Sequence, residues 1–113
     1  MRQAKRYGKR ERRSTLASSE LTEKEFQASV ISLAKLHGWK VYHTFDSRKS
    51  EKGFPDLILL RGLKLLAIEC KTTTGKVTEE QANWLIAFSH VERVEAMVLR
   101  PAEDLDAIEL VLR

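Results

Sequence analysis

The spacing of apolar residues changes several times along the chain, and each change marks the boundary of a predicted element. Apolar residues recur every three or four positions where a helix buries one face, and every second position where a strand is half buried. Polar stretches with glycine or proline separate these segments. In order, the sequence predicts a helix at 22–37, strands at 39–45, 55–60 and 65–71, a helix at 78–90, and a strand at 95–100.

The connections between these elements predict the sheet. A short turn with Gly62 joins the second and third strands, which should therefore pair antiparallel. The third and fourth strands are joined through a helix, which predicts a parallel crossover. The order α-β-β-β-α-β indicates a mixed β-sheet of about four strands flanked by helices, an α/β fold. Residues 101–113 are predicted to form a short helical turn and then a possible edge segment.

Length and composition limit the classes of protein that fit. The chain has 113 residues, of which 42% are hydrophobic, so we expect one domain with one modest core. No apolar run approaches the roughly 20 residues of a membrane helix, and the charged N-terminus does not resemble a secretory signal. The single cysteine, Cys70, excludes an internal disulfide and a multi-cysteine zinc site. We therefore expect an intracellular protein.

The positive charge is concentrated at the N-terminus. Residues 1–18 contain seven Lys or Arg and one Glu, a net charge of +6, whereas the remainder carries −2. We therefore divide the chain into a basic arm, residues 1–18, and a single domain, residues 19–113. Such an arm suits a phosphate backbone, because each neutralised phosphate releases counterions. A basic terminus that only improves solubility is the alternative.

Three charged residues stand on strands that are otherwise apolar. Glu69 and Lys71 are two positions apart and therefore point to the same face of the third strand. Asp56 follows Pro55 at the start of the neighbouring strand. If the hairpin closes around the turn with Gly62, Asp56 lies near the level of Glu69, and the two carboxylates converge.

Converging carboxylates beside an amine suit metal-dependent cleavage of phosphodiester bonds. Carboxylate oxygens are preferred ligands of Mg²⁺, which can polarise a phosphate and lower the pKa of bound water. The lysine can orient or deprotonate that water, or neutralise charge that grows on the phosphorane. The alternative is a surface salt bridge between Glu69 and Lys71, with Asp56 as a turn residue.

These motifs together resemble the VRR-NUC (virus-type replication-repair nuclease) branch of the PD-(D/E)xK nucleases. Pro55–Asp56, Glu69 and Lys71 match the PD-(D/E)xK signature. The branch is similar in its early acidic helix ("TEKEFQ"), its "GFPD" and "IECK" strands, and the segment "GKVTEEQ". The similarity covers roughly residues 22–100.

The resemblance implies a restriction-endonuclease-like core, dependence on Mg²⁺ or Mn²⁺, and activity on DNA. Small stand-alone members are similar to junction resolvases and tend to be homodimers. Asp56 and Glu69 would be metal ligands and Lys71 the catalytic lysine. The backbone carbonyl of Cys70 would be a further ligand, while its side chain points to the opposite, buried face.

Two glutamates near the start of the first helix must be distinguished. With Phe26 at the centre of the buried face and 100° per residue, Glu23 lies about 60° away and Glu25 about 100° away on the other flank. Val30 draws the buried face towards Glu23. Thr22 and Glu25 also form a capping box. We therefore expect Glu23, which also matches the family's early acidic residue, to support the metal site.

Gln81 allows two interpretations. Thr78 and Gln81 form a second capping box, which is a sufficient structural reason for the glutamine. The family pattern places a glutamine near the active site at this position. Both roles are compatible if the start of this helix faces the scissile phosphate, since helix N-termini favour anions.

Basic residues around this site are candidate DNA contacts, with ordinary solvated positions as the alternative. His43 is expected at the surface of its strand and not as a ligand. The candidate phosphate contacts are Arg48 and Lys49 in the loop before "GFPD", Lys76 before the second helix, and Arg10, Arg12 and Arg13 in the arm.

The sequence thus predicts a Mg²⁺-dependent DNA endonuclease that acts on branched or junction DNA in replication, repair or recombination. A non-catalytic nucleic-acid-binding module with the same fold is the main alternative. A sequence-specific restriction enzyme fits less well, because the chain lacks additional recognition elements.

Overall fold

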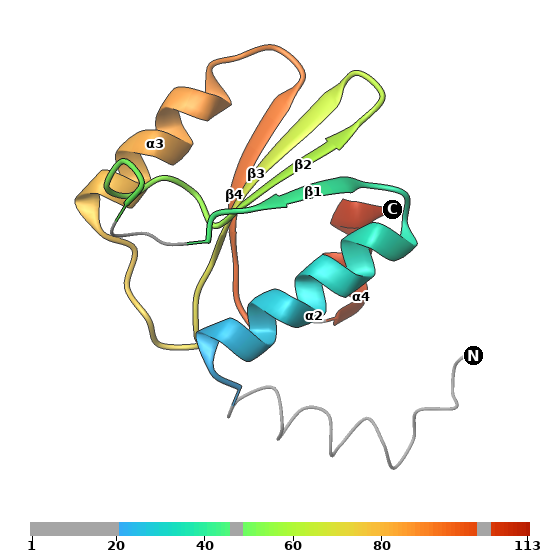
Figure 1. Ribbon diagram of the computed structural model, residues 1–113, viewed down its shortest axis with the longest axis horizontal. Helices are drawn as coiled ribbons and strands as arrows, with labels where there is room; N and C mark the ends of the chain where they lie inside the picture. Colours follow the sequence, from blue (N-terminus) through green and yellow to red (C-terminus); the bar gives the residue numbers. More distant parts are fainter. Residues whose placement is uncertain (1–20, 46–48, 102–104) are drawn as a thin grey trace.

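A four-stranded mixed sheet forms the centre of the protein (Figure 1). The structure is a computed structural model and describes residues 21–45, 49–101 and 105–113. Among these residues, no helix has both the length and the apolar character needed to cross a membrane. The elements, in chain order, are α2 (Glu23–Leu36), β1 (Lys40–His43), β2 (Leu57–Arg61), β3 (Lys64–Cys70), α3 (Glu79–Ser89), β4 (Val94–Leu99) and α4 (Leu105–Leu112).

The strands lie side by side in chain order, β1-β2-β3-β4. β1 pairs antiparallel with β2, and β2 pairs antiparallel with β3 through the turn at Gly62. β3 and β4 pair in parallel, as the intervening helix predicts. The predicted mixed sheet and its strand directions are therefore confirmed, although β1 ends at His43, two residues before the predicted end.

The two faces of the sheet are covered by different helices (Figure 1). α2 and α4 lie on one side, and α3 lies on the other beside β3 and β4. The core between the sheet and the first helix pair contains alternate residues of the central strands, as period-two patterning requires. Its members from β2 and β3 are Leu57, Leu59, Leu66, Ile68 and Cys70, all fully buried.

The C-terminal segment is a helix, so the predicted edge segment is wrong. α4 places Ile108 and Leu112 four positions apart on one face, and both are buried in the core. The carbonyl of Leu112 accepts hydrogen bonds from Trp39 Nε1 at 2.6 Å and from Arg61 Nη1 at 3.2 Å. Burial of Ile108 and Leu112 against α2 favours the helical period in this segment.

The segment before β2 is held against α3. Phe54 contacts Trp84 and Phe88 edge to face, with ring centroids 5.0 and 5.9 Å apart, respectively. Trp84 Nε1 donates a hydrogen bond to the carbonyl of Lys52 at 3.1 Å. Gly53 has φ +86°, and a Cβ there would lie 2.6 Å from the Glu80 carbonyl carbon. The glycine therefore permits the close approach that fixes the start of α3 beside β2.

We predict that Gly53→Ala lowers the free energy of unfolding by about 1–3 kcal/mol more than Gly38→Ala, because only the first substitution overpacks against backbone. Gly38 also has φ +86°, but a Cβ there meets nothing closer than Arg61 Cδ at 3.9 Å. The control thus carries the same strain of a left-handed residue without the clash. Urea unfolding of both variants measures the difference, and equal losses would contradict this account of the packing.

Candidate active site

Three carboxylates from separate elements meet at one end of the sheet. Oxygen atoms of Glu23, Asp56 and Glu69 all lie within 4.8 Å of one another. The register pairs Leu57 with Ile68, and its continuation by one residue sets Asp56 opposite Glu69. Glu23 is the first residue of α2. The expected convergence of the two strand carboxylates is therefore present, and the helix supplies a third.

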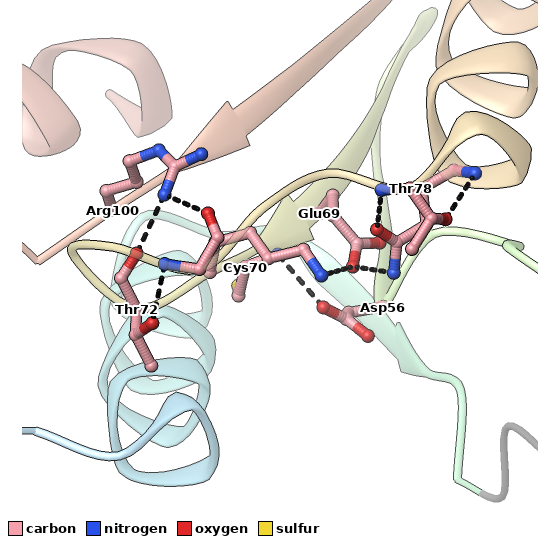
Figure 2. A network of polar contacts seen from close by, with 9 residues as sticks. Asp56, Glu69, Cys70, Thr72, Thr78 and Arg100 are labelled. Atoms are coloured by element: carbon pink, nitrogen blue, oxygen red, sulfur yellow. Dashed lines mark hydrogen bonds and ion pairs between the residues drawn. The ribbon is translucent and has the colours of Figure 1, made fainter.

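The backbone of Cys70 fixes Asp56. Its N–H donates a hydrogen bond of 2.9 Å to Asp56 Oδ2 (Figure 2). The N–H and C=O of one strand residue point to the same side, so the Cys70 carbonyl also faces the Asp56 side. The next residue, Lys71, turns its N–H to the Leu99 carbonyl of β4 at 3.0 Å. The predicted carbonyl ligand is thus directed towards the gap beyond the end of β2.

The Cys70 side chain has a separate role. It is fully buried in the core with Ile68 and Leu66, on the face opposite Glu69. Burial raises the pKa of its thiol, and the carboxylates Asp56, Glu69 and Glu23 raise it further. A thiol that resists ionisation is a poor nucleophile and metal ligand, so the sulfur packs rather than reacts.

Glu69 is buried and only partly satisfied. Its exposed fraction is 1%, and Gln81 Nε2 donates to its Oε2 at 2.9 Å. Lys71 Nζ lies 3.8 Å from the same oxygen. Among the described residues, no group forms a hydrogen bond to the buried Oε1. One oxygen of this carboxylate is therefore held by the protein, and the other is left for a further partner.

Gln81 caps α3 and contacts Glu69 at the same time. Its Oε1 accepts a hydrogen bond from the Thr78 N–H at 2.9 Å, and Thr78 Oγ1 accepts from the Gln81 N–H at 3.1 Å. This reciprocal cap uses the amide oxygen only. The amide nitrogen donates to Glu69 Oε2.

The capping box of α2 separates its two glutamates. Glu25 Oε1 accepts a hydrogen bond from the Thr22 N–H at 3.0 Å, and Thr22 Oγ1 accepts from the Glu25 N–H at 3.1 Å. Glu25 is thereby directed to the helix end. Glu23 instead reaches the carboxylates of Asp56 and Glu69. The predicted division between cap and cluster is present.

The electrostatics of the cluster favour protonation in the absence of a cation. Burial and the neighbouring Asp56 charge together raise the pKa of Glu69 to about 8, although Lys71 opposes the rise. Burial also raises the pKa of Asp56, although the Cys70 N–H opposes the rise. The pKa of Glu23 is raised by burial and by Asp56. Burial and the Asp56 charge therefore make both Glu69 and Glu23 harder to ionise.

These donors fit a hard divalent cation. Three carboxylates converge, and the buried Oε1 of Glu69 has no donor within the described protein. A buried carboxylate oxygen without a partner is costly, and a cation would satisfy it. Oxygen-only donors match Mg²⁺ or Mn²⁺ rather than a softer metal.

The remaining predicted contacts lie at the periphery or outside the described residues. Lys49 and Lys76 are exposed, so both are accessible to a phosphate backbone. His43 is exposed at the end of β1, as expected. Its electrostatic interaction with Asp56 opposes the rise that burial causes in the pKa of that carboxylate. Arg10, Arg12, Arg13 and Arg48 fall outside the residues that the structure describes.

Sequence reasoning missed two polar residues that the structure singles out. Gln27 is 8% exposed and follows Glu23 by one helical turn, a spacing that could have identified it. Arg100 contacts the loop that follows Lys71 through carbonyl oxygens of Thr72 and Gly75. Nothing in the local sequence pattern indicates this contact, because it depends on β4 lying beside β3.

Comparison with known proteins identifies the family. The sequence profile of the VRR-NUC domain matches residues 3–102. The chain belongs to the VRR-NUC domain family. The match begins within the basic arm, well before the residues that carry the resemblance in the sequence. No curated protein sequence matches this chain.

Two solved structures share the fold of this VRR-NUC domain. A protein described as a VRR_NUC domain protein has a TM-score of 0.61 and 23% identity, covering 82% of this chain and 91% of its own. The Holliday junction resolvase Hjc of Archaeoglobus fulgidus, an archaeal hyperthermophile, has a TM-score of 0.53 and 20% identity, covering 70% of this chain and 68% of its own. The expected restriction-endonuclease-like α/β fold is therefore confirmed.

The raised pKa of Glu69 predicts how stability of the metal-free VRR-NUC domain varies with pH. The folded protein retains this proton up to about pH 8, whereas the unfolded chain releases it near 4.5. The free energy of unfolding should therefore fall as pH rises from about 4.5 to about 8. Glu69→Gln has no ionisable group at this position, so its free energy of unfolding should rise relative to that of wild type as pH increases from about 4.5 to about 8.

Thermal unfolding in EDTA at about pH 5 and pH 8.5 measures the effect. At the higher pH, Glu69→Gln should unfold at least about 4 °C above wild type, the shift that about 1 kcal/mol gives in a domain of this size. Glu25→Gln changes a carboxylate outside the cluster and should show no such gain. If Glu69→Gln and wild type have the same melting temperature at both pH values, Glu69 does not have the raised pKa assigned to it.

Proposed function

We propose that this chain is a Mg²⁺-dependent DNA endonuclease that hydrolyses phosphodiester bonds, with Mn²⁺ able to substitute. The observation that carries the proposal is the meeting of three carboxylates beside an amine. Glu23, Asp56 and Glu69 lie within 4.8 Å of one another, and Lys71 Nζ lies 3.8 Å from Glu69. Membership of a nuclease domain family supports the same conclusion.

Each group has a distinct task in this proposal. Glu23, Asp56, Glu69 and the Cys70 carbonyl would hold the cation, which when bound polarises the scissile phosphate and increases the acidity of water. The Cys70 N–H keeps Asp56 in place, and Gln81 orients Glu69 by holding its Oε2.

Lys71 is the proposed catalytic lysine. Its amino group lies beside the carboxylates on the same face of the sheet, where it can orient the attacking water and offset negative charge that grows on the phosphate. Only 8% of Lys71 is exposed, so little water competes for the amino group. Because water is largely excluded, the interaction of the amine with an anionic transition state is stronger than it would be in bulk water.

We predict that Lys71→Met lowers the rate of DNA cleavage at least about 100-fold while the dissociation constant for DNA changes little, because a positioned acid–base group contributes about that much. Cleavage and binding of the same labelled DNA should be measured with Mg²⁺ and with Mn²⁺. Lys40→Met is the matched control and should retain cleavage, because Lys40 is exposed and pairs with Leu60, at the end of β2 away from Asp56.

The same experiment tests the main alternative, a nucleic-acid-binding module that retains the nuclease fold without activity. A wild-type protein that binds DNA but does not cut it with either metal would favour that alternative. The buried, partly unsatisfied carboxylate of Glu69 favours the enzyme, because a binding surface has no need of it.

Branched or junction DNA is the proposed substrate, in replication, repair or recombination. A small chain offers little surface for contacts to base edges, which favours recognition of shape and backbone. The fold shared with a Holliday junction resolvase supports this choice. A homodimer is proposed because two active sites are needed to cut a symmetric junction, and twofold dimers are the commonest assemblies.

We predict that four-way and flapped DNA are cut at least about tenfold faster than linear duplex of the same sequence, corresponding to about 1.4 kcal/mol of transition-state discrimination. Initial rates on the three substrates with Mg²⁺ measure this ratio. Lys71→Met, purified in parallel, controls for contaminating nucleases. Equal rates on all three substrates would refute specificity for branched DNA without affecting the assignment as a nuclease.

The basic arm and the peripheral lysines complete the proposal. Residues 1–18 would contact the phosphate backbone through Arg10, Arg12 and Arg13, and residues 19–113 would form the catalytic domain. Arg48, Lys49 and Lys76 would contact phosphates nearer the cut. An intracellular location agrees with a DNA substrate and a single, buried cysteine.

A further inference from the structure

Arg100, directly after β4, contacts the loop that follows the neighbouring strand β3 and Lys71. Its Nη1 donates to the carbonyl oxygens of Thr72 at 2.8 Å and Gly75 at 2.6 Å (Figure 2). A third carbonyl, of Thr73, lies at 3.5 Å. Carbonyl oxygens that point to one place repel one another, and a guanidinium between them reverses this repulsion.

The loop held by Arg100 is closed on itself. The Gly75 N–H donates to Thr72 Oγ1 at 2.9 Å, and Thr73 and Thr74 between them are exposed. With two exposed polar residues at its tip, this turn buries little apolar surface. Its conformation must therefore depend on a few polar contacts, of which those of Arg100 involve a charged donor.

The closed loop also lies against the Lys71 side chain. A Cβ at Gly75 would lie 3.6 Å from Lys71 Cδ and 2.8 Å from Thr72 Oγ1. Gly75 therefore lies beside the aliphatic part of the lysine, where an added methyl group would touch it. Beyond that part, Lys71 Nζ lies 3.8 Å from Glu69 Oε2. Arg100, Gly75 and the Lys71 side chain therefore lie next to one another in that order.

We propose that Arg100 is a positioning residue for Lys71, acting through the Thr72–Gly75 turn. The proposal rests on the function proposed above, in which Lys71 is the catalytic lysine. Arg100 holds Gly75 beside the aliphatic part of the lysine, which limits the positions open to the amine. Without Arg100, the carbonyls of Thr72 and Gly75 would separate and Gly75 would move. The amine would then lie beside Glu69 for less of the time.

The effect on cleavage should fall on turnover. Arg100→Ala should lower kcat on a four-way DNA about tenfold or more while KM and the dissociation constant change less than about twofold, as expected when only a transition-state interaction is lost. In a Lys71→Met background the same substitution should have almost no further effect, because both changes remove one function. Arg100→Lys should restore part of kcat, since an ammonium can reach one carbonyl but lacks the several fixed donors of a guanidinium.

Arg61 provides a matched control. It also donates to three carbonyl oxygens, those of His37, Leu112 and Arg113, but at the other end of β2. Arg61→Ala should lower the melting temperature and leave kcat unchanged well below that temperature. A loss of kcat in both variants at matched stability would show a general effect of destabilisation and overturn the positioning role.

Amide hydrogen exchange tests the same contact without cleavage. In Arg100→Ala, the Gly75 amide should exchange at least about tenfold faster than in wild type, while the Ile68 amide in the centre of β3 stays protected. If Arg100→Ala does not fold, Arg100→Lys is used for both measurements. Hydrogen exchange tests the contact between Arg100 and Gly75 even if the wild-type protein does not cut DNA. Absence of cleavage by the wild type would refute the proposed function instead.

Hydrogen exchange at Gly75 and kcat, measured together, decide whether Arg100 positions Lys71. Faster exchange at Gly75 with lower kcat supports the proposal. Faster exchange with unchanged kcat, or unchanged exchange at Gly75, overturns it. Weaker DNA binding with unchanged kcat also overturns it, because Arg100 would then contact DNA rather than position Lys71.

Discussion

A carboxylate buried in the central strand is the constraint on which the site depends. Glu69 is 1% exposed and lies among apolar neighbours of β3, where an unpartnered charge is unfavourable. Gln81 and Lys71 both approach its Oε2, and its Oε1 has no donor among the described residues. Contacts within the described residues therefore offset part of the cost of burial, and a cation at Oε1 would offset more of it.

The rest of the fold supplies rigid support for this strand residue. On the opposite face, Leu66, Ile68 and Cys70 pack against α2 and α4, which prevents a shift of register that would turn Glu69 towards the core. Asp56 is tied to the same strand by the Cys70 N–H. The carboxylates therefore stay close together although the Asp56 charge raises the pKa of both Glu69 and Glu23, and the site is maintained at a cost in stability.

Helix caps decide which polar groups reach the site. In α2 the cap occupies Glu25 and leaves Glu23 for the cluster. In α3 the cap occupies only the oxygen of the Gln81 amide and leaves its nitrogen for Glu69. A side chain that caps its own helix has few rotamers available, so each cap also orients the first turn towards the carboxylates.

The sequence by itself determined the strands, the two capping boxes and the alternation that separates Glu69 from Cys70, because these follow from local spacing and short-range hydrogen bonds. It also indicated that Asp56 would face Glu69, since a short turn fixes the register of a hairpin. It did not determine α4, whose helical form depends on burying Ile108 and Leu112 against α2. Nor did it reveal the contact of Arg100 with Thr72 and Gly75, because these residues meet only when β4 pairs with β3, and pairing between distant segments is decided by tertiary packing.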